Sequence, residues 1–202
     1  MFSEGQSKSD IALSKRLSYL LRHGAVREGL NIKPNGFVAV DELLNKLYQC
    51  TIDDIERVVK KNNKQRFTLA TVNGVLEIKA NQGHSISRIS ELSLKILDCV
   101  DFDIIHGTYF KYWSRIKTEG LSRMKRNHVH FAKGLNFVNG LRQSAELFVY
   151  INFERAKEDG LIFRESENNV VLCAGNSKGL IETKYFLKVL TRDGQTLNFD
   201  EK

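Results

Sequence analysis

The spacing of apolar residues changes near the middle of this chain, and that change limits the possible folds more than any other feature of the sequence. In the first half of the chain, at 13–21 and 52–59, apolar residues recur every three to four positions, as they do on one face of an amphipathic helix. From about Cys99 onwards the apolar runs are shorter, and glycine and aromatic residues are more frequent, which is typical of β-structure. The sequence therefore predicts an α+β protein with a disordered tail at 1–9, a helical first lobe at 10–95 and a β-rich second lobe at 96–202.

The first lobe shows the order of elements that is typical of a winged helix. We predict three helices, a short strand and a hairpin, in the segments 10–22, 37–40, 42–47, 51–59, 66–70 and 75–80. Asp10 and either Thr51 or Asp53 are candidate helix caps, and Gly24 suits a left-handed residue just after the first helix. Asn73-Gly74 favours a two-residue hairpin turn, because both residues tolerate a positive φ.

The second lobe is predicted mainly as short strands. They lie at 104–108, 128–132, 146–153, 170–173, 185–190 and 197–199. Helices are expected at 109–117, where Gly120 follows as a stop signal, and at 137–142. We interpret 85–97 as the linker between the two lobes.

Basic residues outnumber acidic ones, since 31 Lys and Arg stand against 24 Asp and Glu, a net charge of +7. Six of the basic residues lie between Arg115 and Lys133, where Glu119 is the one acidic residue. Such a segment is either a solvated loop or a cradle for phosphates, which arginine can bind through two parallel hydrogen bonds. The charge favours a polyanionic partner such as nucleic acid.

Missing motifs argue against several classes of site. The three cysteines include no C-x-x-C pair, so neither a disulfide framework nor a cysteine zinc site is indicated. The H-E-x-x-H, phosphate-loop, dinucleotide-loop and G-x-S-x-G patterns are absent. His128 and His130 would share one face of a strand, but no further ligand completes a metal site. With no secretory signal and no apolar run of membrane-spanning length, the sequence predicts a cytoplasmic or nuclear protein without a membrane partner.

The first helix has an apolar stripe and a second, polar face. The stripe consists of Leu13, Leu17, Leu20 and Leu21. Arg16, Tyr19 and His23 lie three or four residues apart and can share the other face. Cations at a helix C-terminus are favoured by the helix dipole alone, so the basic residues here either only stabilise the helix end or belong to a face that presents arginine, tyrosine and histidine for a function.

Several motifs taken together resemble one family. In chain order they are LSKRLSYLLRHGA, NNKQRF, NQGHSI, IHGTYFKYWSRIKTEGLSRMKRNHVHFA and GLRQS. Their order and content are similar to those of the tRNA 2′-phosphotransferase family, from about Asp10 to Leu190. The resemblance implies a winged-helix lobe and an ADP-ribosyltransferase-like lobe that face each other across a cleft.

The resemblance also implies an activity. Family members remove the internal 2′-phosphate that tRNA ligation leaves at a splice junction. The phosphate is transferred to NAD⁺ through RNA-2′-phospho-ADP-ribose, which gives 2′-OH RNA, ADP-ribose 1″,2″-cyclic phosphate and nicotinamide, and no metal is needed. The implied partners are therefore a tRNA or other RNA with an internal 2′-phosphate and NAD⁺ as co-substrate, and a monomer is the expected assembly state.

The family's catalytic set is three arginines and a histidine. The Arg-His pair of the LLRH motif corresponds to Arg22 and His23, the arginine of QRF to Arg66, and the arginine of the segment before an apolar strand to Arg142. Fixed guanidinium groups suit the reaction, because negative charge builds up on phosphate oxygens in its transition state. His23 is a candidate general acid or base, or a donor to the phosphate.

Further contacts are implied for the two substrates. Those for NAD⁺ are His106, Gly107, Thr108, Arg123, Arg126 and His130. Within this set His106 would contact the adenosine ribose, the two arginines the pyrophosphate, and His130 is favoured over His128. Contacts with RNA are expected at Lys15, Arg16 and Lys64.

Two other functions stay open at the level of sequence. A basic winged-helix module that binds nucleic acid without catalysis explains the charge and the first lobe, but not the HGT and RNHVHFA motifs. ADP-ribosylation of terminal phosphates on nucleic acid keeps the fold and changes the acceptor. A binding module releases no nicotinamide, whereas terminal ADP-ribosylation releases nicotinamide and leaves a lasting adduct.

Overall fold

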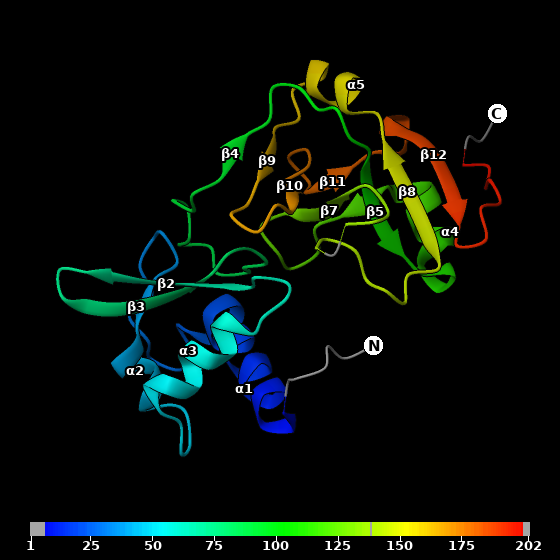
Figure 1. Cartoon of the computed structure of the whole chain (residues 1–202). Helices are drawn as coiled ribbons and strands as arrows, with labels where there is room; N and C mark the ends of the chain where they lie inside the picture. Colours follow the sequence, from blue (N-terminus) through cyan, green and yellow to red (C-terminus); the bar gives the residue numbers. More distant parts are fainter. Residues whose placement is uncertain (1–6, 138, 200–202) are drawn as a thin grey trace. The chain divides into compact units, whose positions relative to one another are not determined.

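The computed structural model describes residues 7–137 and 139–199. The chain is an α+β protein, as predicted (Figure 1). The chain forms two compact units, of which unit 1 ends at Ser93 and unit 2 begins at Leu94. In the described part of the chain, no helix combines the length and the apolar character needed to cross a membrane.

Unit 1 combines helices with a small antiparallel sheet. The helical elements are α1 (Lys8–Tyr19), the π-helical turn η1 (Leu20–Gly24), α2 (Val40–Leu44) and α3 (Ile52–Lys60). The sheet contains β1 (Val38–Ala39), β3 (Val75–Ala80) and β2 (Phe67–Val72) in that spatial order. The predicted order of elements is thus confirmed, with the hairpin strands β2 and β3 joined by Asn73 and Gly74 at positive φ, 51° and 80°.

The core of unit 1 forms where the helical pattern placed it. Leu17, Leu20 and Leu21 have no exposed surface, and they pack in one cluster with Ile55 and Val58 of α3. Thr51 caps α3 in a reciprocal arrangement, in which its hydroxyl accepts from the backbone of Asp54 and the Asp54 carboxylate accepts from the backbone of Thr51. Of the two candidate caps, Thr51 and Asp53, Thr51 is therefore the N-cap of α3.

The start of the first helix was predicted wrongly. Helix α1 begins at Lys8, and the Ser7 hydroxyl caps it by accepting from the backbone N–H of Asp10 at 3.1 Å. The predicted tail is thus ordered at residues 7–9, while residues 1–6 lie outside the described part of the chain. Asp10 binds Arg57 of α3 instead of capping, with 2.9 Å between Oδ1 and Nη2.

The end of this helix also differs from the prediction. Gly24 lies within η1 and has no positive φ; the next glycine along the chain, Gly29, has a φ of +72°. Glycine is needed at position 24 for space, because an added Cβ would lie 2.6 Å from Cε1 of Tyr19.

Unit 2 is organised around a seven-stranded antiparallel sheet. In spatial order the strands are β12 (Phe186–Thr191), β8 (Leu147–Ile151), β5 (Ile104–Thr108), β7 (Val129–Lys133), β10 (Val171–Cys173), β9 (Phe163–Glu165) and β4 (Lys95–Ile96). The other elements are α4 (Phe110–Glu119), α5 (Phe153–Glu158), the 3₁₀ turn η2 (Thr183–Tyr185) and the paired short strands β6 (Leu121–Ser122) and β11 (Leu180–Ile181).

Strand β8 shows why the sheet forms as it does. All five of its residues are buried, and it lies between β12 and β5. Val149 and Ile151 belong to the larger apolar cluster, whereas Phe148 and Tyr150 belong to a smaller one on the other face. A strand covered on both faces is apolar throughout, which is why its pattern did not alternate.

Two predicted elements of unit 2 are wrong. The described residues of 137–142 form bends rather than a helix, and residue 138 lies outside the described chain. Gly140 has a φ of +82°, and a Cβ there would lie 2.5 Å from the carbonyl oxygen of Phe131, so this segment runs as an irregular strap against β7. Residues 197–199 are not a strand, because pairing near them is limited to a bridge between Leu190 and Thr196.

Candidate functional site

The segment 81–85, which directly follows β3, fixes the start of β2. The backbone N–H of Asn81 donates to the carbonyl of Arg66 at 2.9 Å, and its side-chain amide donates to the carbonyl of Gln65 at 2.8 Å. The hydroxyl of Thr68 in turn donates to Oδ1 of Asn81 at 2.7 Å. These hydrogen bonds fix the backbone from which the Arg66 side chain extends.

The guanidinium of Arg66 is oriented by a buried amide. Oδ1 of Asn62 accepts from both Nη1 and the backbone N–H of Arg66, each at 3.3 Å. Asn62 is 4% exposed, and its Nδ2 donates to the hydroxyl of Ser14 on α1 at 3.4 Å. Burial lowers the pKa of Arg66 from its usual value. Arginine still stays charged at neutral pH, and partial burial strengthens its attraction for an anion.

Arg22 and His23 lie in η1, and the other end of the 81–85 segment packs against them. The backbone N–H of Ser85 donates to the carbonyl of Arg22 at 2.9 Å, and the Ser85 hydroxyl lies 2.9 Å from Nδ1 of His23. Gly83 has a φ of +91°, and a Cβ there would lie 3.4 Å from Cδ and Nε of Arg22. One short segment therefore contacts all three predicted catalytic residues of unit 1.

The three residues predicted to contact RNA lie in two different places in unit 1. Lys64 is close to Arg66, and burial together with the Arg66 charge lowers the pKa of Lys64. Lys15 and Arg16 are exposed on α1. The Arg16 guanidinium lies 5.4 Å from the centre of the Tyr19 ring, and its Nη2 lies 3.7 Å from Glu28. Lys64 therefore lies near Arg66, whereas Arg16 contacts Tyr19 and Glu28 instead.

In unit 2, Arg142 is exposed on an irregular segment that Arg192 holds in place. Arg192 lies in the turn after β12; its Nε donates to the carbonyl of Ala145 at 2.9 Å and its Nη2 donates to the carbonyl of Gln143. The backbone N–H of Ala145 donates to the carbonyl of Arg142 at 3.0 Å. The segment is therefore fixed by a guanidinium from a distant part of the sequence.

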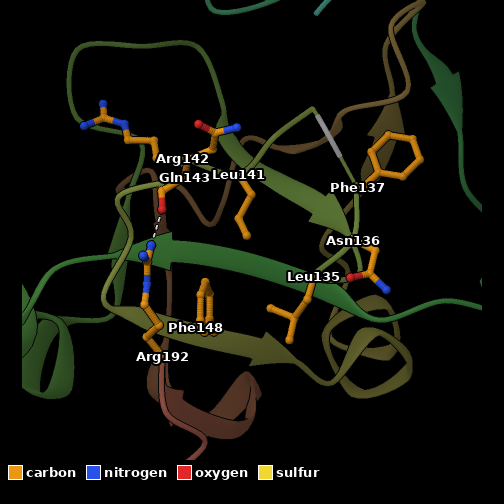
Figure 2. Close-up of a pocket in the computed structure, with 8 residues that line it drawn as sticks. All are labelled: Leu135, Asn136, Phe137, Leu141, Arg142, Gln143, Phe148 and Arg192. Atoms are coloured by element: carbon orange, nitrogen blue, oxygen red, sulfur yellow. Dashed lines mark hydrogen bonds between the residues drawn. The ribbon is translucent and has the colours of Figure 1, made fainter. Parts of the chain in front are cut away.

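A pocket of about 520 Å³ lies beside this segment. Leu141 and Phe148 point towards each other across it, while the guanidinium of Arg142 points away from both (Figure 2). The apolar wall thus fixes the base of the segment, and the charged group of Arg142 is presented outwards.

The N-terminus of α4 is attached to the same segment. The hydroxyls of Tyr109 and Ser144 lie 2.8 Å apart, and the backbone N–H of Phe110 donates to Oε2 of Glu146 at 2.9 Å. Hydrogen bonds from Ser144 and from Arg142 lower the pKa of Tyr109. We call residues 142–146 together with Tyr109, Phe110 and Arg192 the Arg142 corner.

The surroundings of His106 on β5 favour the neutral imidazole with its proton on Nδ1. Its Nδ1 lies 2.9 Å from the carbonyl oxygen of His130; since a carbonyl only accepts, Nδ1 carries the proton. Burial lowers the pKa of His106, and the charges of Arg142 and Arg126 lower it further. At neutral pH the ring is therefore uncharged, and its Nε2 is an acceptor.

His106 and His130 lie on opposite faces of the sheet. Ile104 pairs with Lys133 and Ile105 with Ala132, so alternation puts the side chain of His106 on the face of Phe131 and that of His130 on the face of Ala132. The ring contact between His106 and Phe131, with centroids 5.9 Å apart, agrees with this register. The structure thus does not bring the two imidazoles together.

Gly107 and Thr108, the next two residues of the predicted site, pack against the segment that carries Arg142. A Cβ on Gly107 would lie 2.9 Å from Cβ of Ala145 and 3.2 Å from Leu141, so glycine there admits the strap that carries Arg142. Thr108 is 5% exposed, and its carbonyl accepts from the backbone N–H of Glu146 at 2.8 Å.

The remaining predicted residues lie in the turn between β6 and β7. Nη1 of Arg123 donates to the carbonyl of Arg126 at 2.8 Å, which closes the turn. Burial lowers the pKa of Arg126, and the charge of Arg142 lowers it further. His128 precedes β7, and burial, with Arg164 and Arg123 nearby, lowers its pKa to about 4. Among residues 7–137 and 139–199, no group of three His, Cys, Asp or Glu side chains is arranged to bind a metal ion.

A family model described as RNA 2′-phosphotransferase, Tpt1 / KptA family, matches residues 8–175 of this chain. The chain belongs to this family. It is 42% identical to tRNA 2′-phosphotransferase 1 of Danio rerio over 91% of this chain and 87% of that protein. It is also 38% identical to the tRNA 2′-phosphotransferase of Saccharomyces cerevisiae, over 96% and 90% of the two chains.

Membership in the RNA 2′-phosphotransferase family makes the chain an enzyme and confirms the resemblance predicted from its motifs. Every site residue predicted from the sequence falls within the matched residues 8–175, whereas Arg192 lies beyond them.

Sequence reasoning missed the residues that hold the predicted site in place. Asn62, Asn81 and Ser85 stand inside the quoted motifs NNKQRF and NQGHSI, so their presence in those motifs was a signal that could have been used. For Arg192 the sequence offered no signal, because its contacts depend on β12 returning beside β8.

Proposed function

We propose that this protein removes the internal splice-junction 2′-phosphate of ligated tRNA by transferring it to NAD⁺. The products would be 2′-OH RNA, ADP-ribose 1″,2″-cyclic phosphate and nicotinamide. The observation that carries the proposal is the 81–85 segment, which contacts Arg22, His23 and Arg66 together. Membership in the family supports it, since relatives bear the name tRNA 2′-phosphotransferase.

The chemistry of these three side chains suits a phosphate ester. Arg22 and Arg66 are partly buried, so each would bind phosphate oxygens in a setting with little competing water. His23, with Nδ1 beside Ser85, is available as the group that gives a proton to the departing RNA 2′-oxygen. In this proposal unit 1 is the winged-helix-like lobe, and Lys15, Arg16 and Lys64 contribute to RNA binding there.

Unit 2 is proposed as the ADP-ribosyltransferase-like lobe that binds NAD⁺. Its residues fit a dinucleotide, because the charges of Arg126 and Arg142 lie near His106, whose Nε2 can accept from a ribose hydroxyl. Bound NAD⁺ supplies an electrophilic ribose carbon from which nicotinamide can leave. Arg126 would neutralise the pyrophosphate, and Arg142 supplies the fourth member of the catalytic set.

The test uses purified protein and a short RNA with one internal 2′-phosphate, incubated with and without NAD⁺ in a buffer that contains a metal chelator. The mass of the RNA is followed. Loss of one phosphate only when NAD⁺ is present is the expected result. A stable gain of one ADP-ribose would indicate transfer to a different acceptor, and an unchanged RNA would contradict the proposal.

A further inference from the structure

Aromatic side chains are exposed at the start of α4, next to Arg142. Phe110 and Tyr112 are 53% and 51% exposed. The rings of Tyr109 and Tyr112 lie edge to face with their centroids 6.3 Å apart. Large exposed aromatic side chains that cluster in this way mark an interaction surface.

A cation completes this surface. Nζ of Lys111 lies 4.9 Å from the centre of the Tyr112 ring and 5.8 Å from that of Tyr109. The acidic residue at this end of α4 is Glu146, and one of its carboxylate oxygens accepts from the backbone N–H of Phe110 at 2.9 Å. Arg142 adds a second positive charge through its contact with Tyr109. We call Tyr109, Lys111 and Tyr112 the α4 surface.

The α4 surface is held rigid towards Arg142. The hydroxyl of Tyr109 is bound to Ser144 at 2.8 Å, and the helix N-terminus is fixed to Glu146 at 2.9 Å. Arg192 holds the same segment through Ala145 and Gln143. A ligand on the α4 surface would therefore have a constant distance to a phosphate bound by Arg142.

We propose that the α4 surface binds the nucleotide next to the 2′-phosphorylated one, by stacking its base on Tyr112 and pairing its phosphate with Lys111. The inference rests on the proposed function for its RNA, and it adds the place where a flanking nucleotide is held. Aromatic rings interleaved with cations suit single-stranded nucleic acid, because every base has a face that can stack and every nucleotide carries a phosphate. A protein partner is a poorer match, because the centre of a protein–protein interface is usually depleted of charged residues. Here Lys111 lies on the surface and Arg142 lies next to it.

The experiment measures equilibrium binding of RNA oligonucleotides by the full chain without NAD⁺, so that turnover plays no part. Each RNA has one internal 2′-phosphate and either a normal or an abasic nucleotide on one side of it. Tyr112→Leu should bind the normal RNA about tenfold more weakly and the abasic RNA as the wild type does. Tyr112→Phe should keep the wild-type affinity, which separates stacking from damage to the fold.

A second variant tests the cation. Lys111→Ala should weaken binding whichever base is present, and it should reduce the slope of log affinity against log salt concentration by about 0.7. The matched control is Tyr48→Ala in unit 1, because Tyr48 is 90% exposed and lies outside the proposed RNA contacts.

Equal weakening of normal and abasic RNA in Tyr112→Leu would overturn the stacking. Unchanged RNA affinity in both Tyr112→Leu and Lys111→Ala would overturn the proposal. Failure of the wild type to remove the 2′-phosphate would instead refute the proposed function, and that result is read in the separate turnover assay.

Discussion

The 81–85 region of unit 1 and the Arg142 corner of unit 2 both fix arginines, but by different means. In unit 1 the anchors Asn62, Asn81 and Ser85 lie in the short motifs NNKQRF and NQGHSI. In unit 2 the anchor is Arg192, some fifty residues along the chain from Arg142, and the segment it holds is irregular. Motifs therefore point to the proposed reacting groups in both regions, but they contain the supporting residues in only one.

The largest effect is expected for Arg66, whose backbone the 81–85 segment fixes. Arg66→Ala should lower 2′-phosphate removal about 100- to 1000-fold, by analogy with the loss of one donor to a developing oxyanion. In the proposed reaction, removal of the phosphate from RNA-2′-phospho-ADP-ribose has a more demanding phosphate transition state than formation of this intermediate, so ADP-ribosylated RNA should accumulate and be detected by mass. Arg27→Ala, an exposed arginine of the same unit, is the control; equal loss of both steps in Arg66→Ala would contradict the assigned role.

In the Arg142 corner we expect a smaller loss of activity for Arg192→Ala, and this loss should depend on whether Arg142 is present. Arg192→Ala should lower kcat/KM about tenfold, because the carbonyls of Ala145 and Gln143 lose their donor and Arg142 is no longer held in one position. In the double variant with Arg142→Ala, the Arg192 change should cost little more, as expected when one residue acts through the other. Additive losses would refute the positioning role, and Arg155→Ala on α5 serves as the control.

Ser85 offers a finer test of the 81–85 region. Ser85→Ala removes the hydroxyl 2.9 Å from Nδ1 of His23, so kcat should fall about fivefold while KM for RNA changes little. Ser85→Thr keeps a hydroxyl and should retain most of the activity. A rise in KM with unchanged kcat would show that Ser85 affects RNA binding rather than the orientation of His23.

The smallest effect concerns stability, and it should be confined to unit 1. A hydrogen bond from Arg57 lowers the pKa of Asp10, so the native state binds fewer protons than the unfolded state near the ordinary pKa of 3.8. This stabilisation is complete well above that pH and is lost as the pH falls below it. Asp10→Asn should cost about 1 kcal/mol at pH 7, or roughly 2–4 °C in Tm, and less at pH 3.

Hydrogen exchange locates this effect. Faster exchange in α1 and α3 of Asp10→Asn, with unit 2 unchanged, is the expected pattern, and Asp101→Asn is the control because its carboxylate is exposed. An equal loss of stability at pH 7 and pH 3 would show that the charge of Asp10 is not what stabilises the two helices.

The sequence predicted those parts of the molecule that depend on local pattern. The leucine stripe of α1, the Asn73-Gly74 hairpin and the strand at 104–108 were predicted correctly because helix period, turn chemistry and alternation are local properties. The strap at 137–142 was predicted as a helix because its shape is set by contact of Gly140 with β7, which no local pattern records. Likewise, strand alternation at 128–130 could not reveal that His106 and His130 lie on opposite faces of the sheet, since this depends on the register between β5 and β7.

The measurement that tests the central claim most directly is ³¹P NMR of an RNA whose 2′-phosphate is followed through the reaction with NAD⁺. If the protein transfers the phosphate, the signal should leave the RNA and reappear as the five-membered cyclic phosphate of ADP-ribose, in equal amount to the nicotinamide released. Appearance of the phosphorus as inorganic phosphate, or loss of the 2′-phosphate without NAD⁺, would identify a hydrolase and contradict the account.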